Sequence, residues 1–263
     1  MDRLGNGPLH LAARDGTLKD LQRLMPEDAR DLHLEARNRD LETPLQLAMQ
    51  HASLQMVEFL IQRGANVNSE SRYDRTPLHN ILIWHNDAKL LIAEKLLQSR
   101  ADVNAITDTG ETPLMLSGTA EMSTLLIEHH ARVDAVNDDG VTALHFAVMQ
   151  SYDLTRTLLD AGASVSLRDE HGRTALYDAV SDDDVYIVGL LITYGSDSST
   201  KCEYGHSPAS LAALHNNQPM VDAIKTADTL LSLPVEKEIL ERIMSLAFPS
   251  PEEQESENNQ HER

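Results

Sequence analysis

A short motif recurs along most of this chain, and this repetition constrains the fold more than any other feature. The motif begins near residues 7, 43, 76, 112, 142, 174 and 207, at intervals of 36, 33, 36, 30, 32 and 33 residues. A second mark, such as the one at residues 64–68, follows most of these starts by about 21 residues. Two marks that keep step at one period indicate a repeat protein, in which each unit is too small to bury its apolar face alone and stacks on its neighbours.

Each repeat has the pattern of a turn followed by two helices. In the repeat that starts at Thr142, the threonine suits a helix N-cap, and the small alanine after it allows close helix packing. Leu154 and Leu158 follow with the spacing of one apolar helix face. Gly162 suits the left-handed residue that ends a helix. The pattern therefore predicts seven turn-helix-helix units.

The motif Thr76-Pro77-Leu78-His79 resembles the Thr-Pro-Leu-His-x-Ala motif of the ankyrin repeat family, and variants of it recur in the other repeats. The resemblance covers about residues 6–225. It implies an all-α ankyrin-repeat solenoid, an L-shaped stack of helix-turn-helix units with hairpin-like loops that project to one side. The repeat that starts at 76 carries about three extra residues and the repeat that starts at 112 lacks about three, so local bends are expected there.

The repeat pattern gives the expected domain organisation. Residues 1–225 form the ankyrin repeat domain, residues 226–248 a C-terminal capping or docking helix, and residues 249–263 a disordered acidic tail. In the C-terminal helix, an apolar stripe with helical spacing follows Leu233-Pro234, and the prolines Pro249 and Pro251 end it. One interpretation is that this helix covers the exposed core of the last repeat.

The other interpretation is that the C-terminal helix docks on a ubiquitin-ligase adaptor. Its start resembles the Leu-Pro-x-Glu-Ile opening of an F-box, or of the F-box-like tail that follows ankyrin arrays in some viral and bacterial proteins. Lys237 and Glu238 shift that register by two residues, and the segment is shorter than a full F-box. Under this hypothesis the chain is a substrate receptor of a ubiquitin ligase, and the adaptor-docking residues are Leu233, Pro234, Val235, Ile239, Ile243 and Leu246.

The family resemblance implies a protein-protein interaction module, which would act as a scaffold, an adaptor or an inhibitor. In that family the concave surface of hairpin tips and first helices is the usual binding surface. Large aromatic and arginine side chains dominate binding energy at interfaces, so Tyr73, Arg75 and Trp84 are the strongest candidates for contact. The alternative for Trp84 is that it fills a gap made by the local insertion. The full set of candidate partner-binding residues is Tyr73, Arg75, Ile83, Trp84, Glu111, Val141, Met149, Gln150, His171, Arg173, Asp182 and Tyr204.

The charge balance favours a protein partner. The chain has 42 Asp and Glu against 22 Lys and Arg, a formal net charge of −20, which opposes binding to nucleic acid and to anionic membranes. We therefore expect another protein or peptide as the partner, with a basic or uncharged surface favoured, and a monomeric chain. No apolar leader and no stretch of 18 apolar residues occurs. The single Cys202 suits a reducing compartment, so the cytoplasm is the expected location, with the nucleus left open.

The sequence offers little that resembles an active site. It lacks a Gly-Lys-Ser/Thr phosphate loop, a Gly-x-Ser-x-Gly elbow and a His-Glu-x-x-His metal motif. His10, His79 and His145 hold the fourth position of their repeats, where the ankyrin family uses histidine to hydrogen-bond between loops. The acidic run at 182–184, with Asp178 one turn before it, lacks the alternating ligands of a calcium loop, and the run is expected to be a solvated inter-helix loop. We expect no enzyme activity, no metal and no cofactor.

One residue resembles a modification site. Leu96 and Asn104 match the ankyrin pattern in which some oxygen-dependent hydroxylases modify the asparagine. The same asparagine is also a routine turn residue of the hairpin, and this structural role is the favoured interpretation for Asn104.

Overall fold

The chain folds into pairs of short helices, as the repeat pattern predicts. A computed structural model describes residues 2–26, 33–50, 53–84 and 88–231, and within these ranges it contains helices and no β-strand. The all-α prediction is therefore confirmed. In chain order the elements are α1 (Pro8–Asp15), α2 (Leu18–Leu24), α3 (Pro44–Gln50), α4 (Leu54–Gln62), η1 (Arg72–Asp74), α5 (Pro77–Ile83), α6 (Lys89–Gln98), η2 (Pro113–Leu116), α7 (Ala120–Glu128), α8 (Ala143–Ala147), α9 (Tyr152–Asp160), α10 (Ala175–Ser181), α11 (Val185–Thr193), α12 (Pro208–Leu214) and α13 (Gln218–Leu231).

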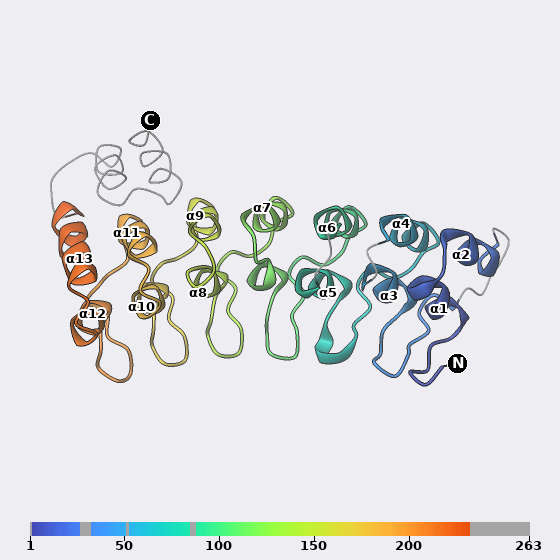
Figure 1. The fold of residues 1–263 in the computed structure, drawn as a ribbon, viewed down its shortest axis with the longest axis horizontal. Helices are drawn as coiled ribbons and strands as arrows, with labels where there is room; N and C mark the ends of the chain where they lie inside the picture. The colour runs from blue at the N-terminus through green and yellow to red at the C-terminus, as the bar shows by residue number, and fades with distance from the viewer. Residues whose placement is uncertain (1, 27–32, 51–52, 85–87, 232–263) are drawn as a thin grey trace, which may run out of the picture. The chain divides into compact units, whose positions relative to one another are not determined.

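The described helices form seven pairs, one for each sequence repeat, which we number one to seven (Figure 1). In repeats two to seven the second helix is longer than the first, whereas in repeat one α2 is one residue shorter than α1. The 3-10 helix η2 takes the place of the first helix in repeat four. That repeat lacks about three residues in the sequence. A shorter, more tightly wound turn is what a first helix with fewer residues can form.

The chain divides into two compact bodies. The N-terminal body comprises Met1–Ser117 and Leu125–Arg132, and the C-terminal body comprises Gly118–Thr124 and the residues from Val133 onward. The division falls in repeat four, so α7 carries residues of both bodies.

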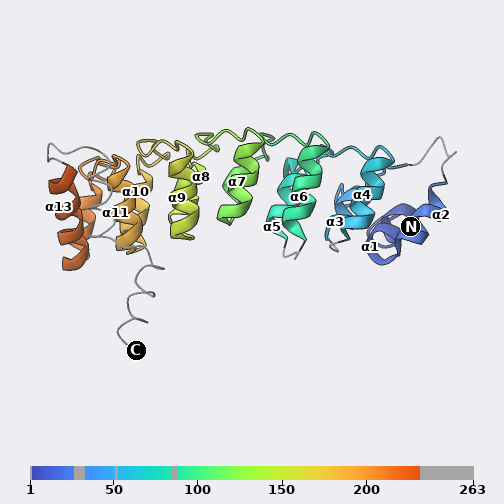
Figure 2. The same ribbon diagram turned by 90° about the horizontal axis from the view of Figure 1, so that it is seen from above.

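In each body the first helices pack on one another and the second helices cover them. In the N-terminal body α3 contacts α1 and α5, while α4 contacts α2 and α6. In the C-terminal body α10 contacts α8 and α12, and α9, α11 and α13 lie side by side (Figure 2). The hairpins of a body extend from the same side of its first helices (Figure 1).

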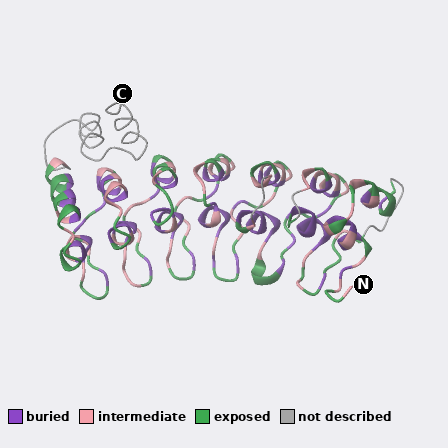
Figure 3. Cartoon of the chain, in the orientation of Figure 1, coloured by how far each residue is buried: buried purple, intermediate pink, exposed green. Residues whose placement is uncertain are grey.

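The core of each body is built from the leucines and alanines that keep the repeat period. Leu78 and Leu96 are fully buried in the N-terminal body, as are Leu176 and Leu191 in the C-terminal body. Figure 3 shows the buried residues on the facing sides of the helices and the exposed residues at hairpin tips and outer faces. These leucines are structural, as the stacking argument predicts.

Left-handed residues end most of the second helices. Gly162 has φ +88°, which confirms the predicted C-cap glycine, and Gly64 and Gly195 have φ +91°. In repeats three and four the same place is taken by Arg100 and His130, with φ 70° and 69°. A side chain in this conformation costs about 1 kcal/mol or more, so these two helix ends are strained.

Two features concern the limits of the fold. Helix α13 extends to Leu231, six residues beyond residue 225, where the sequence analysis ended the repeats. The predicted capping or docking helix covers residues 226–248, of which 226–231 belong to α13 and 232–248 lie outside the described residues. No helix in the described part of the chain is long and apolar enough to span a bilayer.

Candidate functional site

The hairpin tips at 137–141 and 169–173 are each fixed by a side chain that bonds back to its own turn. Asn137 Oδ1 accepts hydrogen bonds from the backbone N–H of Asp139 at 3.1 Å and of Val141 at 2.8 Å. Asp169 Oδ1 does the same for His171 at 3.0 Å and Arg173 at 2.8 Å. The turn backbone is thereby satisfied internally, which leaves the side chains at the tip free to meet a partner.

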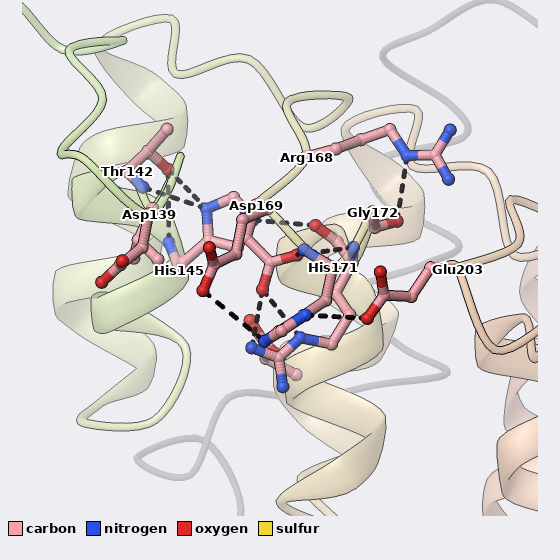
Figure 4. Close-up of polar contacts among 12 residues, drawn as sticks. Asp139, Thr142, His145, Arg168, Asp169, His171, Gly172 and Glu203 are labelled. Carbon is pink, nitrogen blue, oxygen red and sulfur yellow. Dashed lines mark hydrogen bonds and ion pairs between the residues drawn. The ribbon is translucent and has the colours of Figure 1, made fainter.

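Histidines tie three of the hairpins to the first helix of the preceding repeat. His145 Nδ1 accepts from the backbone N–H of Thr142 at 3.2 Å, so Nε2 carries the proton and donates to the carbonyl oxygen of Arg173 at 3.3 Å (Figure 4). His10 and His79 make the equivalent contacts with the next hairpin. The predicted structural role of these histidines is confirmed. Burial lowers the pKa of His79 and of His145, which keeps both rings neutral.

In the N-terminal body the candidates form two pairs at opposite ends of α5. Before this helix, the Arg75 guanidinium lies 5.4 Å from the centre of the Tyr73 ring, and Tyr73 is 59% exposed. At the other end, Ile83, the last residue of the helix, is exposed and Trp84, which follows it, is half-buried. Glu111, the fifth candidate, is half-buried, and its carbonyl oxygen accepts the bond from His79.

The turn that carries Tyr73 has an unusual backbone. Tyr73 and Asp74 both have left-handed φ values, 63° and 53°, where most of the other hairpins place a glycine. Arg75 Nε is buried and has no hydrogen-bond partner among the described residues. Strained backbone and an unsatisfied buried donor both occur preferentially at binding sites, so this turn remains the strongest candidate of the N-terminal body.

In the C-terminal body, the candidates differ in how strongly other residues of the protein already hold their side chains. His171 Nδ1 lies 2.8 Å from Glu203 Oε1, and its ring lies 6.2 Å from that of Tyr204, which is strongly exposed (Figure 4). Arg173 is held by Asp169, with Nη2 and Nε at 2.6 and 2.7 Å from Oδ2. Arg173 is therefore largely committed to the fold.

The remaining candidates of this body stand at its first-helix ends and hairpins. Met149 and Gln150 follow α8 and are exposed, as is Asp182 directly after α10, whereas Val141 is half-buried in its hairpin. In the described part of the chain, no side-chain contact would prevent these residues from meeting a partner.

Sequence reasoning did not include Asp178 among the candidates, although the structure gives it an unusual environment. Its side chain is 14% exposed in α10. Burial raises the pKa of this carboxyl to about 6, although Arg173 lowers it in part. The signal in the sequence is positional, because Leu47 and Phe146 hold the equivalent place in other repeats. Asp169 shows the opposite outcome: burial acts to raise its pKa, but the bonds from Arg173 outweigh burial and lower it.

The acidic run at 182–184 is a loop between helices, as its sequence indicates. Asp184 Oδ1 caps α11 by accepting from the N–H groups of Tyr186 at 2.9 Å and Ile187 at 3.0 Å, while Asp182 and Asp183 are exposed. In the described residues no three His, Cys, Asp or Glu side chains are grouped so that they could hold a metal ion.

Asn104 has the turn role that the sequence favours. Its Nδ2 donates to the carbonyl oxygen of His130 at 3.2 Å, and its Oδ1 accepts from the N–H of Arg132 at 2.8 Å. The hydroxylation of Asn104 stays a prediction.

Comparisons with known proteins agree on one family. A model of three successive ankyrin repeats matches residues 9–95 and again residues 83–169. The chain is 27% identical over 235 residues to the nuclear factor NF-kappa-B p105 subunit of Gallus gallus, which is 86% of this chain and 20% of that protein. It is 32% identical over 141 residues to the neurogenic locus notch homolog protein 1 of Mus musculus, which is 52% of this chain and 6% of that protein. The chain therefore spans a fifth or less of the length of these relatives.

A solved structure is similar over most of the chain. The ankyrin repeat domain of Bcl-3, described as a unique member of the IkappaB protein family, superimposes with a TM-score of 0.72 and 28% sequence identity. The match covers 84% of this chain and 99% of that domain.

Proposed function

Because this chain belongs to the ankyrin repeat family, we propose that it is a non-catalytic module that binds another protein through its hairpin tips and first-helix ends. One observation carries this proposal: the hairpin backbones are fixed by internal bonds, whereas their tip side chains are exposed and differ from repeat to repeat. A surface that is ordered before binding loses little conformational entropy on association, so modest contacts suffice for affinity.

The charge of the chain supports a basic partner surface. A formal net charge of −20 accelerates association with a basic protein and disfavours acidic ones. We place this function in the cytoplasm, because the single cysteine, Cys202, is a buried free thiol. Whether the module acts as a scaffold, an adaptor or an inhibitor depends on what the partner does when it is free.

Affinity purification with mass spectrometry from the native cell type tests the proposal. The baits are the full-length chain, a 1–232 truncation, the double variant Arg75→Glu with Trp84→Ala, and a matched control, Arg23→Glu with Leu24→Ala. The control likewise reverses one arginine and truncates one large apolar side chain, but at two exposed residues of α2. Far-UV circular dichroism verifies that each variant retains its helices.

We expect one dominant partner that the full-length chain, the truncation and the control retain and that the double variant loses. A partner retained by the double variant would move the binding surface away from Arg75 and Trp84. An adaptor and a cullin recovered only with the full-length chain would instead make the protein a ubiquitin-ligase receptor whose tail, beyond residue 232, is the docking element.

A further inference from the structure

A carboxylate occupies a place where most repeats have an apolar side chain. The fifth residue of the repeat motif is Leu11, Leu47, Asn80, Leu116, Phe146, Asp178 and Leu211 in repeats one to seven. Asn80, the other polar residue in this series, is satisfied, because its Nδ2 donates to Ser71 Oγ at 3.1 Å. Asp178 has no such hydrogen bond in the described part of the chain.

The protein does not supply Asp178 with a full cationic partner. Arg173 Nε lies 4.0 Å from Asp178 Oδ1, but the same guanidinium lies 2.6–2.7 Å from Asp169 Oδ2, so its charge is already neutralised. The helices that pack on α10 are α8, α11 and α12, and their only titratable side chains are His145 and Tyr186. Burial keeps His145 neutral. A desolvated carboxylate without a strong partner is costly, which is the situation that a cation from outside would relieve.

Around Asp178, the surface has acidic side chains between apolar ones. Asp182 follows it by one helical turn on the same face and is exposed, and like charges at this spacing repel each other. Met149, after α8, is 53% exposed, and Leu214, the last residue of α12, is 58% exposed. Because α8, α10 and α12 lie side by side in that order (Figure 1), the acidic pair stands between two apolar residues.

The distance between the helices that form this surface indicates which kind of peptide segment it can bind. Packed helices are about 8–10 Å apart, and an α-helix covers that distance in about five to seven residues. Residues seven apart also point to the same side of a helix, to within about 20°. A polyproline segment is the alternative ligand, but such segments bind in grooves lined with aromatic residues. Met149 and Leu214 are aliphatic, and aliphatic side chains are typical of surfaces that bind amphipathic helices, so a helix is the favoured ligand.

We propose that Met149, Asp178, Asp182 and Leu214 form a docking surface for an amphipathic helix of the partner protein, which carries one lysine or arginine between two apolar residues at intervals of about seven residues. This inference deepens the proposed function and rests on it. The cation lies between the two carboxylates, and the apolar residues cover Met149 and Leu214. The raised pKa of Asp178 makes binding depend on pH. Acidic solution protonates the carboxylate and so removes the negative charge that attracts the cation, and a bound cation in turn lowers the pKa of Asp178.

A library of helical peptides tests the proposal on the full-length chain. The peptides share an alanine–glutamine framework, and three positions spaced about seven residues apart are varied among all residue types. We expect selection of Lys or Arg at the central position and of large apolar residues at the outer two. Replacement of the central cation by norleucine is expected to weaken binding about tenfold.

Three variants of the chain separate binding from stability. Asp178→Leu restores the residue found in most other repeats, so it is expected to raise the unfolding midpoint and yet to weaken peptide binding about tenfold. Asp178→Asn keeps the shape and removes the charge, and is expected to weaken binding similarly. Asp153→Asn removes the same charge at an exposed position of α9, in the same body, and is expected to have no effect on peptide binding.

The pH dependence gives a further readout. Binding to the wild-type chain is expected to weaken between about pH 7.5 and 5.5, as Asp178 takes up a proton. Every other titratable group of the chain is the same in the wild-type protein and in Asp178→Leu. The part of the pH dependence that this variant loses therefore belongs to Asp178.

Each other outcome overturns the inference. Selected peptides without a central cation, or with equal affinity for Asp178→Leu, would show that this face does not recognise a basic helix, and the proposed binding function would stand. Selection of a cation at three-residue spacing would replace the helix with an extended segment. A library that yields no binder would remove this docking surface, while the purification experiment above decides the proposed function independently.

Discussion

Nε2 of His145 lies 3.3 Å from the carbonyl oxygen of Arg173, and this bond joins the first helix of repeat five to the hairpin of repeat six. The bond requires a neutral ring, because Nδ1 of the same imidazole accepts from the N–H of Thr142. The hairpin that it holds carries His171 and Arg173, two of the candidate partner-binding residues. A buried structural histidine therefore positions an exposed surface.

Substitution of His145 tests how much this bond contributes. His145→Ala is expected to lower the free energy of unfolding by about 2–3 kcal/mol, because it leaves a cavity and removes a buried bond. His145→Gln is expected to cost less than about 1 kcal/mol, because Gln46 holds the same position in repeat two and also donates from Nε2 to a carbonyl oxygen of the next hairpin, that of Ser69 at 3.0 Å. Urea unfolding followed by circular dichroism measures both values, and an equal cost for the two variants would contradict this role.

The same histidines predict a loss of stability in mild acid. Their pKa in the folded chain lies below the ordinary value of 6.5, so the unfolded chain binds more protons as the pH falls through about 6.5. The free energy of unfolding is therefore expected to decrease between about pH 7.5 and 5.5. The double variant His79→Gln with His145→Gln is expected to show a smaller decrease, and an unchanged slope in that variant would be the contrary result.

The ionisation of Asp178 changes the stability with pH in the opposite direction to that of the two histidines. Its pKa rises from 3.8 to about 6 on folding, so the folded chain holds more protons between these values. The destabilisation is complete above about pH 6 and disappears as the pH falls towards 4. Since one pKa unit corresponds to about 1.4 kcal/mol, Asp178→Leu is expected to stabilise the protein by about 1–3 kcal/mol at neutral pH. Thermal and urea unfolding at neutral and acidic pH measure this difference, and a less stable variant at neutral pH would refute the account.

The helix ends provide a matched pair of backbone tests. Gly162 has φ +88° and open space where a Cβ would stand, so Gly162→Ala is expected to cost about 1–2 kcal/mol through conformation alone. His130 occupies the same place in repeat four with φ 69°, so His130→Gly is expected to stabilise the chain by about 1 kcal/mol. Opposite signs in urea unfolding would support the assignment, whereas a destabilised His130→Gly would show that the histidine side chain matters more than its backbone.

The sequence predicts well those features that depend on residues at fixed spacing. The seven helix pairs and the C-cap at Gly162 follow from local patterns in the repeats, whereas the bonding role of His145 was implied by the resemblance to the ankyrin family. The left-handed conformations of Arg100 and His130 were not foreseen, because nothing in either residue type favours them, and only the requirement to end the helix at that place imposes them.

The candidate surface was harder to derive, because exposure depends on neighbouring repeats. Arg173 was expected to be available to a partner, but Asp169 from its own hairpin holds it. Asp178 was omitted because a carboxylate on a helix is usually solvated, and its burial results from the packing of α8, α11 and α12 around α10. Tyr73 and Met149 are exposed as expected, because they stand at a hairpin tip and beyond a helix end.

Site-specific photo-crosslinking in cell extract tests the central claim most directly. A photoreactive phenylalanine replaces one residue at a time at three exposed positions of the proposed surface, Tyr73, Met149 and Tyr204, and at two exposed control positions on second helices, Gln98 and Arg156. The account predicts that the partner recovered by purification is crosslinked from the surface positions and not from the controls. Crosslinks to that partner from Gln98 or Arg156 alone would contradict binding through hairpin tips and first-helix ends.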